Sequence, residues 1–167
     1  MDGSGLLYEG GVSYEGRLFF SKSAFDDKST IIGSWEGEQR FIAKSTSFVF
    51  NNSDSLVTSK NAEVTLFYGQ DSVYHPVVEF EYLYGRGYLN LKPGKGGFET
   101  TPFRSAFYNM DVVGDVLDWE MKSDSFNIST LSARTEVPVL IESKNYYTAY
   151  RFYSLTELYN FHPLLMA

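Results

Sequence analysis

The chain has 167 residues, a formal net charge of −7 and no cysteine. The lack of cysteine excludes disulfides, thiolate metal ligands and cysteine nucleophiles. An acidic chain with scattered lysines and arginines also does not suit nucleic acid, which needs clustered cations. Hydrophobic residues make up 43% of the chain and aromatic residues 17%, enough to build a core. No apolar run approaches the about 20 residues of a membrane-spanning helix, so we expect no transmembrane segment.

Alternation of polar and apolar residues begins near the N-terminus. In "VSYEGRLFFS", Val12, Tyr14, Leu18 and Phe20 share one face, which predicts one half-buried strand. The same period predicts further strands at Arg40–Phe50, Glu63–Tyr68, Val77–Tyr84, Tyr88–Leu91, Val112–Lys122 and Val137–Ile141. Turn-forming residues separate these strands at 51–55, 69–72, 92–97 and 142–145. Closely spaced strands without intervening helices predict an all-β fold with antiparallel sheet.

The last segment, 154–167, departs from this pattern. Ser154 lies three residues before Glu157, the spacing of a helix capping box, and Pro163 suits the first turn of a further helix. We therefore expect a β-rich domain over 1–153 and a short C-terminal helix over 154–167. The final "FHPLLMA" is apolar, so we expect that helix to lead toward a following domain of a longer chain.

Several short phrases occur twice in the same order. Trp35-Glu36 recurs as Trp119-Glu120, and Ser47-Phe48 recurs as Ser125-Phe126. The ordered series predicts two related units of roughly 80 residues, at 12–84 and 98–153. A single such unit cannot bury its apolar face alone. Two units would form either an antiparallel sandwich or an elongated stacked sheet, and the sequence leaves both open.

Three stretches carry a resemblance to a known group of proteins. They are "AKSTSFVFNNSDSLVTSKNAEVTLFYGQDSVYHPVVEFEY", "PFRSAFYNMDVVGDVLDWEMKSDSFNIS" and "FHPLLMA". They resemble segments of very large, uncharacterised cell-envelope proteins of the Bacteroidota that contain repeated β segments. The resemblance implies an exported protein, periplasmic or associated with the outer membrane, and it transfers no functional residues. The aromatic strands are also similar in pattern to the sheet repeats of lipopolysaccharide-transport proteins.

No catalytic, cofactor or metal motif is found. His75 and His162 each precede a proline, a turn or strand-edge dipeptide, and neither has a visible set of catalytic partners. "KPGKGG" lacks the spacing of a phosphate-binding loop, and the acidic residues from Asp111 to Glu120 do not match a calcium loop. There is no G-x-S-x-G motif. We therefore predict a protein that is not an enzyme and uses no cofactor.

The aromatic residues give the one candidate binding surface. We expect Trp35 and Trp119 in the core, since both occupy matched places in the repeat. In "YLYGRGY", alternation puts two tyrosines on one face beside an arginine and two glycines. This pattern makes a possible ligand surface of Tyr82, Tyr84, Arg86 and Tyr88.

These observations favour a non-catalytic structural or protein-interaction module of an exported cell-envelope protein. Its expected partners are other domains of a larger chain or other envelope proteins. A carbohydrate-binding module that uses exposed aromatic residues is the first alternative, with a glycan as its partner. A β scaffold that handles lipid or lipopolysaccharide is the second.

Overall fold

The computed structural model describes residues 3–21, 27–94, 101–123, 125–130 and 139–143. These residues form one antiparallel sheet of 14 strands and a single 3-10 helix, η1 (Phe107–Asn109). The prediction of an all-β fold with antiparallel sheet is confirmed. The predicted helix over 154–167 and His162 lie outside the described residues.

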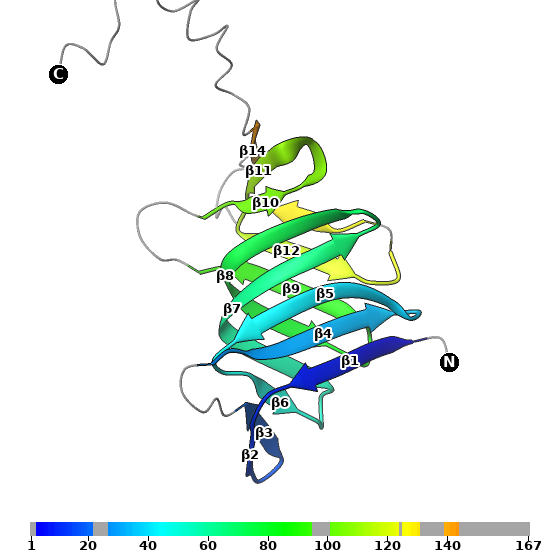
Figure 1. Cartoon of the computed structure of the whole chain (residues 1–167), viewed down its shortest axis with the longest axis vertical. Helices are drawn as coiled ribbons and strands as arrows, with labels where there is room; N and C mark the ends of the chain where they lie inside the picture. Colours follow the sequence, from blue (N-terminus) through cyan, green and yellow to red (C-terminus); the bar gives the residue numbers. More distant parts are fainter. Residues whose placement is uncertain (1–2, 22–26, 95–100, 124, 131–138, 144–167) are drawn as a thin grey trace, which may run out of the picture.

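The sheet has two branches, which we call the first and second layers. The first layer has the strand order β1 (Ser4–Glu9), β4 (Ser29–Trp35), β5 (Glu38–Ser45), β7 (Leu56–Tyr68), β8 (Asp71–Leu83), β10 (Phe103–Ser105), β11 (Met110–Val113) and β14 (Leu140–Ser143). The second layer has β2 (Val12–Glu15), β3 (Leu18–Ser21), β6 (Val49–Asn51), β7 and β8 again, then β9 (Tyr88–Pro93), β12 (Val116–Glu120) and β13 (Asn127–Ser129). Figure 1 shows the first layer in front.

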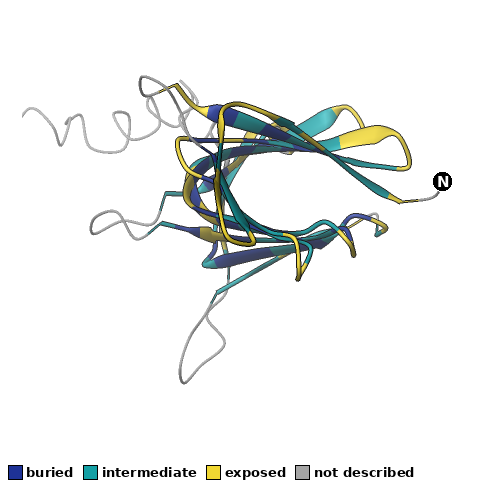
Figure 2. Ribbon diagram, turned by 90° about the horizontal axis from the view of Figure 1, so that it is seen from below, coloured by how far each residue is buried: buried dark blue, intermediate teal, exposed yellow. Residues whose placement is uncertain are grey.

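The long strands β7 and β8 belong to both layers. The start of β7 pairs with β6 and its end pairs with β5, and the register is irregular on both sides of Ala62. Likewise the start of β8 pairs with β10 and its end with β9. Bulges bend strands, so one sheet folds over itself, and Figure 2 shows the two layers joined along one side. Pro76 lies at this irregularity, where its missing N–H costs no ladder hydrogen bond.

The core fills the space between the layers. Phe41 on β5 contacts Phe80 and Tyr82 on the second-layer part of β8, with ring centroids 5.6 and 4.9 Å apart. The Tyr82 hydroxyl donates to the sulfur of Met121 at 3.6 Å. Gly33 is required next to Phe41, because a Cβ there would lie 2.0 Å from its ring. Aromatic rings from both layers therefore form the centre of this core.

On the N-terminal side the layers also touch. The ring of Trp35 packs on Gly87 in the β8–β9 turn, where a Cβ would lie 2.5 Å from the indole. Gly87 also has φ +64°, a conformation that favours glycine. The Ser4 hydroxyl donates to the carbonyl of Tyr84. The N-terminal strands of the first layer are thus anchored to the second layer.

Three of the predicted strands are each divided in two, and those predicted at Glu63–Tyr68 and Val77–Tyr84 are parts of the longer strands β7 and β8. "VSYEGRLFFS" forms the hairpin of β2 and β3 instead of one strand, because Gly16 reverses the chain with φ +63°. The predicted strand Arg40–Phe50 is divided between β5 and β6, and Val112–Lys122 between β11 and β12. In the latter, Gly114 lies against Ile128, where a side chain would clash at 2.3 Å.

The proposed internal duplication stays a prediction. The unit 12–84 contributes strands to both layers, and much of the unit 98–153 lies outside the described residues. The described strands form one folded sheet and are not divided into two sheets.

Candidate functional site

The predicted ligand surface does not form as one surface. Tyr82 is fully buried among the core rings, so it offers no area to a ligand, and this part of the prediction is wrong. Tyr84 follows it on the core-facing side and is half-buried. Arg86 is exposed in the turn. Tyr88 pairs with Leu83, the residue between the two tyrosines, so it lies on the outer face of the second layer.

Both tryptophans pack with the core, as predicted. Trp119 is 1% exposed, and its indole N–H donates to the Ser123 carbonyl at 3.2 Å. Its ring meets that of Phe126 edge-on, with centroids 6.2 Å apart. Trp35 is half-buried on Gly87 and packs against the core. Neither indole forms an exposed platform for a sugar ring.

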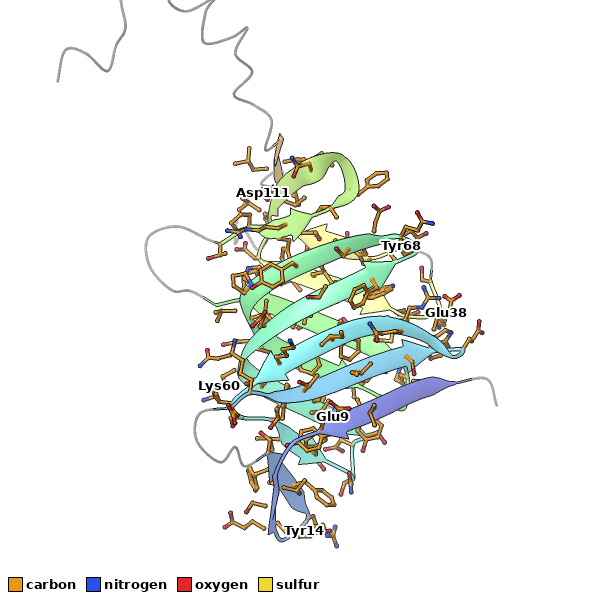
Figure 3. All side chains as sticks on the ribbon, viewed as in Figure 1. Glu9, Tyr14, Glu38, Lys60, Tyr68 and Asp111 are labelled. Carbon is orange, nitrogen blue, oxygen red and sulfur yellow. The ribbon has the colours of Figure 1, made fainter. Side chains whose placement is uncertain are left out.

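Exposed apolar side chains gather on strands at the sheet edges. Among the described residues, eight large apolar side chains are exposed, and five of these lie on β1, β2 or β14. These five are Leu7, Val12, Tyr14, Leu140 and Ile141, with 53 to 66% of each side chain accessible. Figure 1 places β1 and β2 at one end of the long axis and β14 at the other, and Figure 3 labels Tyr14 at the tip of its hairpin.

The edge strands at the N-terminal end lack most of the usual protection against pairing. Within the described part of the chain, β1 pairs only with β4, and β2 pairs only with β3. Each therefore presents a row of backbone N–H and C=O groups that no described strand satisfies. Natural edges are usually protected by very short strands, by charged side chains such as lysine, by proline or by a bulge, and β2 with four residues has the first of these. Neither strand contains lysine or proline, and each has a single charge, at Glu9 or Glu15.

A second feature lies on the outer face of the second layer, opposite the core. Strand pairing places five polar residues in one row across five strands, because each is the register partner of the next. In order from β7 to β13 the polar row consists of Thr58, Glu81, Asn90, Asp118 and Asn127. Their chain neighbours face inward, so the row follows directly from the period of a β-strand.

Asp118 accepts two hydrogen bonds on this face. Its Oδ1 accepts hydrogen bonds from the Tyr88 hydroxyl at 2.5 Å and from the side-chain amide of Asn90 at 2.6 Å. The bond to the Asp118 carboxylate, aided by burial, raises the pKa of Tyr88 above its usual value, so the phenol keeps its proton and remains a donor. Asn90 donates through its nitrogen, which leaves its Oδ1 as an acceptor.

Two hollows flank this network. One has a volume of about 240 Å³ and is lined by Thr58, Lys60, Glu79, Glu81, Asn90 and Lys92, among others. The other has a volume of about 360 Å³, and its lining includes Tyr88, Asp118, Glu120, Ser123, Ser125 and Asn127. The two hollows lie on either side of the Asn90–Asp118 hydrogen bond, so together they span several strands.

A smaller hollow of about 190 Å³ lies beside the β7–β8 turn and η1. Its lining is mostly apolar and includes Leu66, Tyr68, Phe107, Trp119 and Phe126. Its polar lining residues are Asp71, Ser72 and Ser105.

His75 belongs to the bend of β8. It is 1% exposed, its Nδ1 accepts from the Val77 N–H at 3.2 Å, and its Nε2 lies 2.9 Å from the Thr101 carbonyl. A carbonyl only accepts, so the neutral ring carries its proton on Nε2 and both nitrogens are satisfied. Burial lowers the pKa of His75, which favours this neutral form. These contacts give His75 a structural role at the bend of the sheet.

The described residues contain no group of three or more His, Asp or Glu side chains placed to hold a metal ion. In the same part of the chain, no helix is long and apolar enough to cross a bilayer. No protein-family model matches the sequence, and no curated protein was found to match it.

Proposed function

We propose that this chain is a non-catalytic interaction module that binds other polypeptides through its exposed sheet edges. The observation that supports the proposal is the concentration of exposed apolar side chains on β1 and β2, which are also edges without lysine or proline. An extended segment of a partner would add to such an edge as a further strand. Main-chain hydrogen bonds would give it affinity, and alternate side chains would give it specificity.

The free energies involved favour a partner that binds the edges of β1 and β2 together. Burying one large apolar side chain completely contributes about 1.5–3 kcal/mol. Each new backbone hydrogen bond adds about 0.5–1.5 kcal/mol. Association itself costs at least about 4 kcal/mol in lost freedom. At the lower ends of these ranges, Leu7 with two new backbone hydrogen bonds supplies about 2.5 kcal/mol, which does not offset that cost. Leu7, Val12 and Tyr14 together supply about 4.5 kcal/mol before hydrogen bonds are added, which does.

The expected partners are other domains of a longer chain or further proteins of the same compartment. The resemblance to Bacteroidota cell-envelope proteins supports an exported, periplasmic or outer-membrane-associated setting. That setting is part of the proposal, and it rests on the resemblance alone.

Site-specific photocrosslinking tests this function in the cells that make the protein, with the full native chain. A photoreactive amino acid replaces Leu7, Tyr14 or, as a matched control, Val77, which is 45% exposed but lies on β8 between paired neighbours. We expect discrete protein adducts from positions 7 and 14 and none from position 77. Adding Leu7→Lys and Val12→Lys should remove the adduct from position 14. Equal adducts at position 77, or none at the edges, would contradict the proposal.

A further inference from the structure

We propose that the outer face of the second layer binds an oligosaccharide whose hydroxyl groups occupy the two hollows beside Asn90 and Asp118. This site is separate from the edges of β1 and β2, because the polar row crosses the interior strands β8, β9 and β12. Four observations carry the inference: the rigidity of the polar row, its mixture of donors and acceptors, the aromatic ring beside it, and the paired backbones beneath it.

Three polar groups at the middle of this face, those of Tyr88, Asn90 and Asp118, are held in place before any ligand arrives. Tyr88, Asn90 and Asp118 lie on adjacent strands, and the two short hydrogen bonds to the Asp118 carboxylate fix their side chains relative to one another. Ordering flexible side chains on binding costs about 0.5–1.5 kcal/mol each. A network that is already ordered avoids much of this cost, and so suits a ligand that binds through several weak contacts.

The chemistry of the first hollow matches hydroxyl groups better than an ion. Two lysines, Lys60 and Lys92, stand beside two glutamates, Glu79 and Glu81, so the formal charges cancel. None of the ion pairs found in the described part of the chain joins these four side chains. A strong anion would meet the glutamates, and a cation would meet the lysines. A hydroxyl group both donates and accepts, so a polyhydroxy ligand can satisfy both kinds of residue.

The second hollow adds a ring and further neutral polar groups. Tyr88 and Phe126 contribute aromatic surface, and Ser123, Ser125 and Asn127 contribute hydroxyl and amide groups. Sites of this kind combine apolar area with a few placed polar groups. The apolar C–H face of a sugar fits such a ring while its hydroxyl groups reach the neighbouring polar side chains. The hydrogen bond from the Tyr88 hydroxyl to Asp118 holds the ring in position.

A peptide is a poorer fit to this face. Strands β8, β9 and β12 each have a paired strand on both sides, so their backbone groups are already used. An added peptide strand would find no ladder to extend there, in contrast to β1 and β2. Only β13, at the end of the row, has a strand on one side alone within the described residues. Over β8, β9 and β12 a ligand must be bound by side chains, and the side chains present are those that recognise hydroxyl groups.

The test is a titration of intrinsic fluorescence with soluble glucan, mannan, xylan and pectin fragments, since Trp119 and Tyr88 both line the second hollow. We expect saturable binding to at least one neutral fragment. Asn90→Ala and Glu81→Gln should each weaken it by about tenfold or more. The matched control is Thr65→Ala on the outer face of the first layer, which should leave the affinity unchanged.

Two results would overturn the inference: a flat response across the whole panel, or binding with equal affinity in wild type and both variants. Far-ultraviolet circular dichroism confirms that each variant is folded, and Glu81→Gln changes only one atom of the side chain. Leu7→Lys should not alter sugar affinity. Failure of the edge proposal and failure of the sugar site are therefore distinguishable.

Discussion

On the outer face of the first layer, strand pairing brings Leu7, Ile32 and Ile42 side by side. Beyond Ile42 this row continues through Thr65 and Tyr74 to Arg104, and the next row on the same face is Glu9, Thr30, Lys44 and Glu63. In the second layer, pairing aligns hydroxyl, amide and carboxylate groups in the polar row, next to a row that contains Leu56, Leu83 and Tyr88. Both faces back onto one core and belong to one sheet. The requirement to fill the core therefore fixes the inner residues of both layers and leaves the outer ones free to differ. The outer residues of both layers are the part of the sequence that the fold does not explain, and they are where function is best sought.

The largest loss of stability should come from a change in the core that joins the two layers. Phe41→Ala removes a fully buried ring that contacts second-layer Phe80 and Tyr82. We expect the free energy of unfolding to fall by about 3–5 kcal/mol. Urea unfolding followed by circular dichroism measures it.

The matched control is Ile42→Ala, one residue along the same strand on the outer face, where the side chain is only half-buried. This substitution should lower the free energy of unfolding by clearly less than Phe41→Ala does. An equal loss from the two substitutions would mean that the inner and outer faces of β5 are wrongly assigned.

An intermediate effect is expected from the polar row. Asp118→Ala leaves the Tyr88 hydroxyl and the Asn90 amide without their acceptor. These groups are half-buried, so the free energy of unfolding should fall by about 1–2 kcal/mol. The pKa of Tyr88 should also fall toward its ordinary value of 10.0, because the bond that raises it is gone.

Ultraviolet absorbance against pH follows the ionisation of tyrosine and shows this change, with Asp118→Asn as the companion variant that keeps the shape of the side chain. If the tyrosine titration is identical in wild type and Asp118→Ala, the network does not persist in solution.

How far the sequence could predict these features depends on what each requires. Alternation along single strands was sufficient for the fold class, and the matched places of Trp35 and Trp119 in the repeated phrases were sufficient to predict that both pack with the core. It did not show that Tyr82 faces inward, because "YLYGRGY" carries tyrosine on both faces of the hairpin, and the turn before Tyr88 decides which face each takes. The Gly16 turn within the first predicted strand was missed for a similar reason, since a glycine in an alternating run also fits a strand.

The polar row could not be predicted at all. Asn90 and Asp118 meet across β9 and β12, and their separation of 28 residues has no local signature. Register between strands is set by packing and by bulges such as those around Ala62, which no single-strand pattern reveals. The polar residues themselves are visible in the sequence as the outward positions of strands, but their alignment is not.

The smallest effect should come from a carboxylate of the first layer, Glu63, which contrasts with Asp118. It accepts from the Lys28 ammonium at 2.7 Å, and Lys28 is half exposed. The hydrogen bond to Lys28 lowers the pKa of Glu63 below its ordinary value of 4.5. A pair this close to water contributes only about 0.2–1 kcal/mol. Lys28→Ala should therefore barely change the free energy of unfolding at neutral pH, and the pKa of Glu63 should rise toward 4.5.

The sign of the pH dependence follows from that lowered pKa. The folded state binds the Glu63 proton more weakly than the unfolded chain, so the contribution is fully present above pH 4.5 and is lost as the pH falls through the lowered value. Between neutral pH and pH 3, Lys28→Ala should lose slightly less stability than wild type, as measured by thermal unfolding. Lys44→Ala is the control for removing a more distant positive charge. Carboxyl chemical shifts measured by NMR across the same range would report Glu63 directly. A Glu63 pKa that stays lowered in Lys28→Ala would show that groups other than Lys28 lower it. The surroundings of Glu63 and Asp118 would then differ less than their contacts indicate.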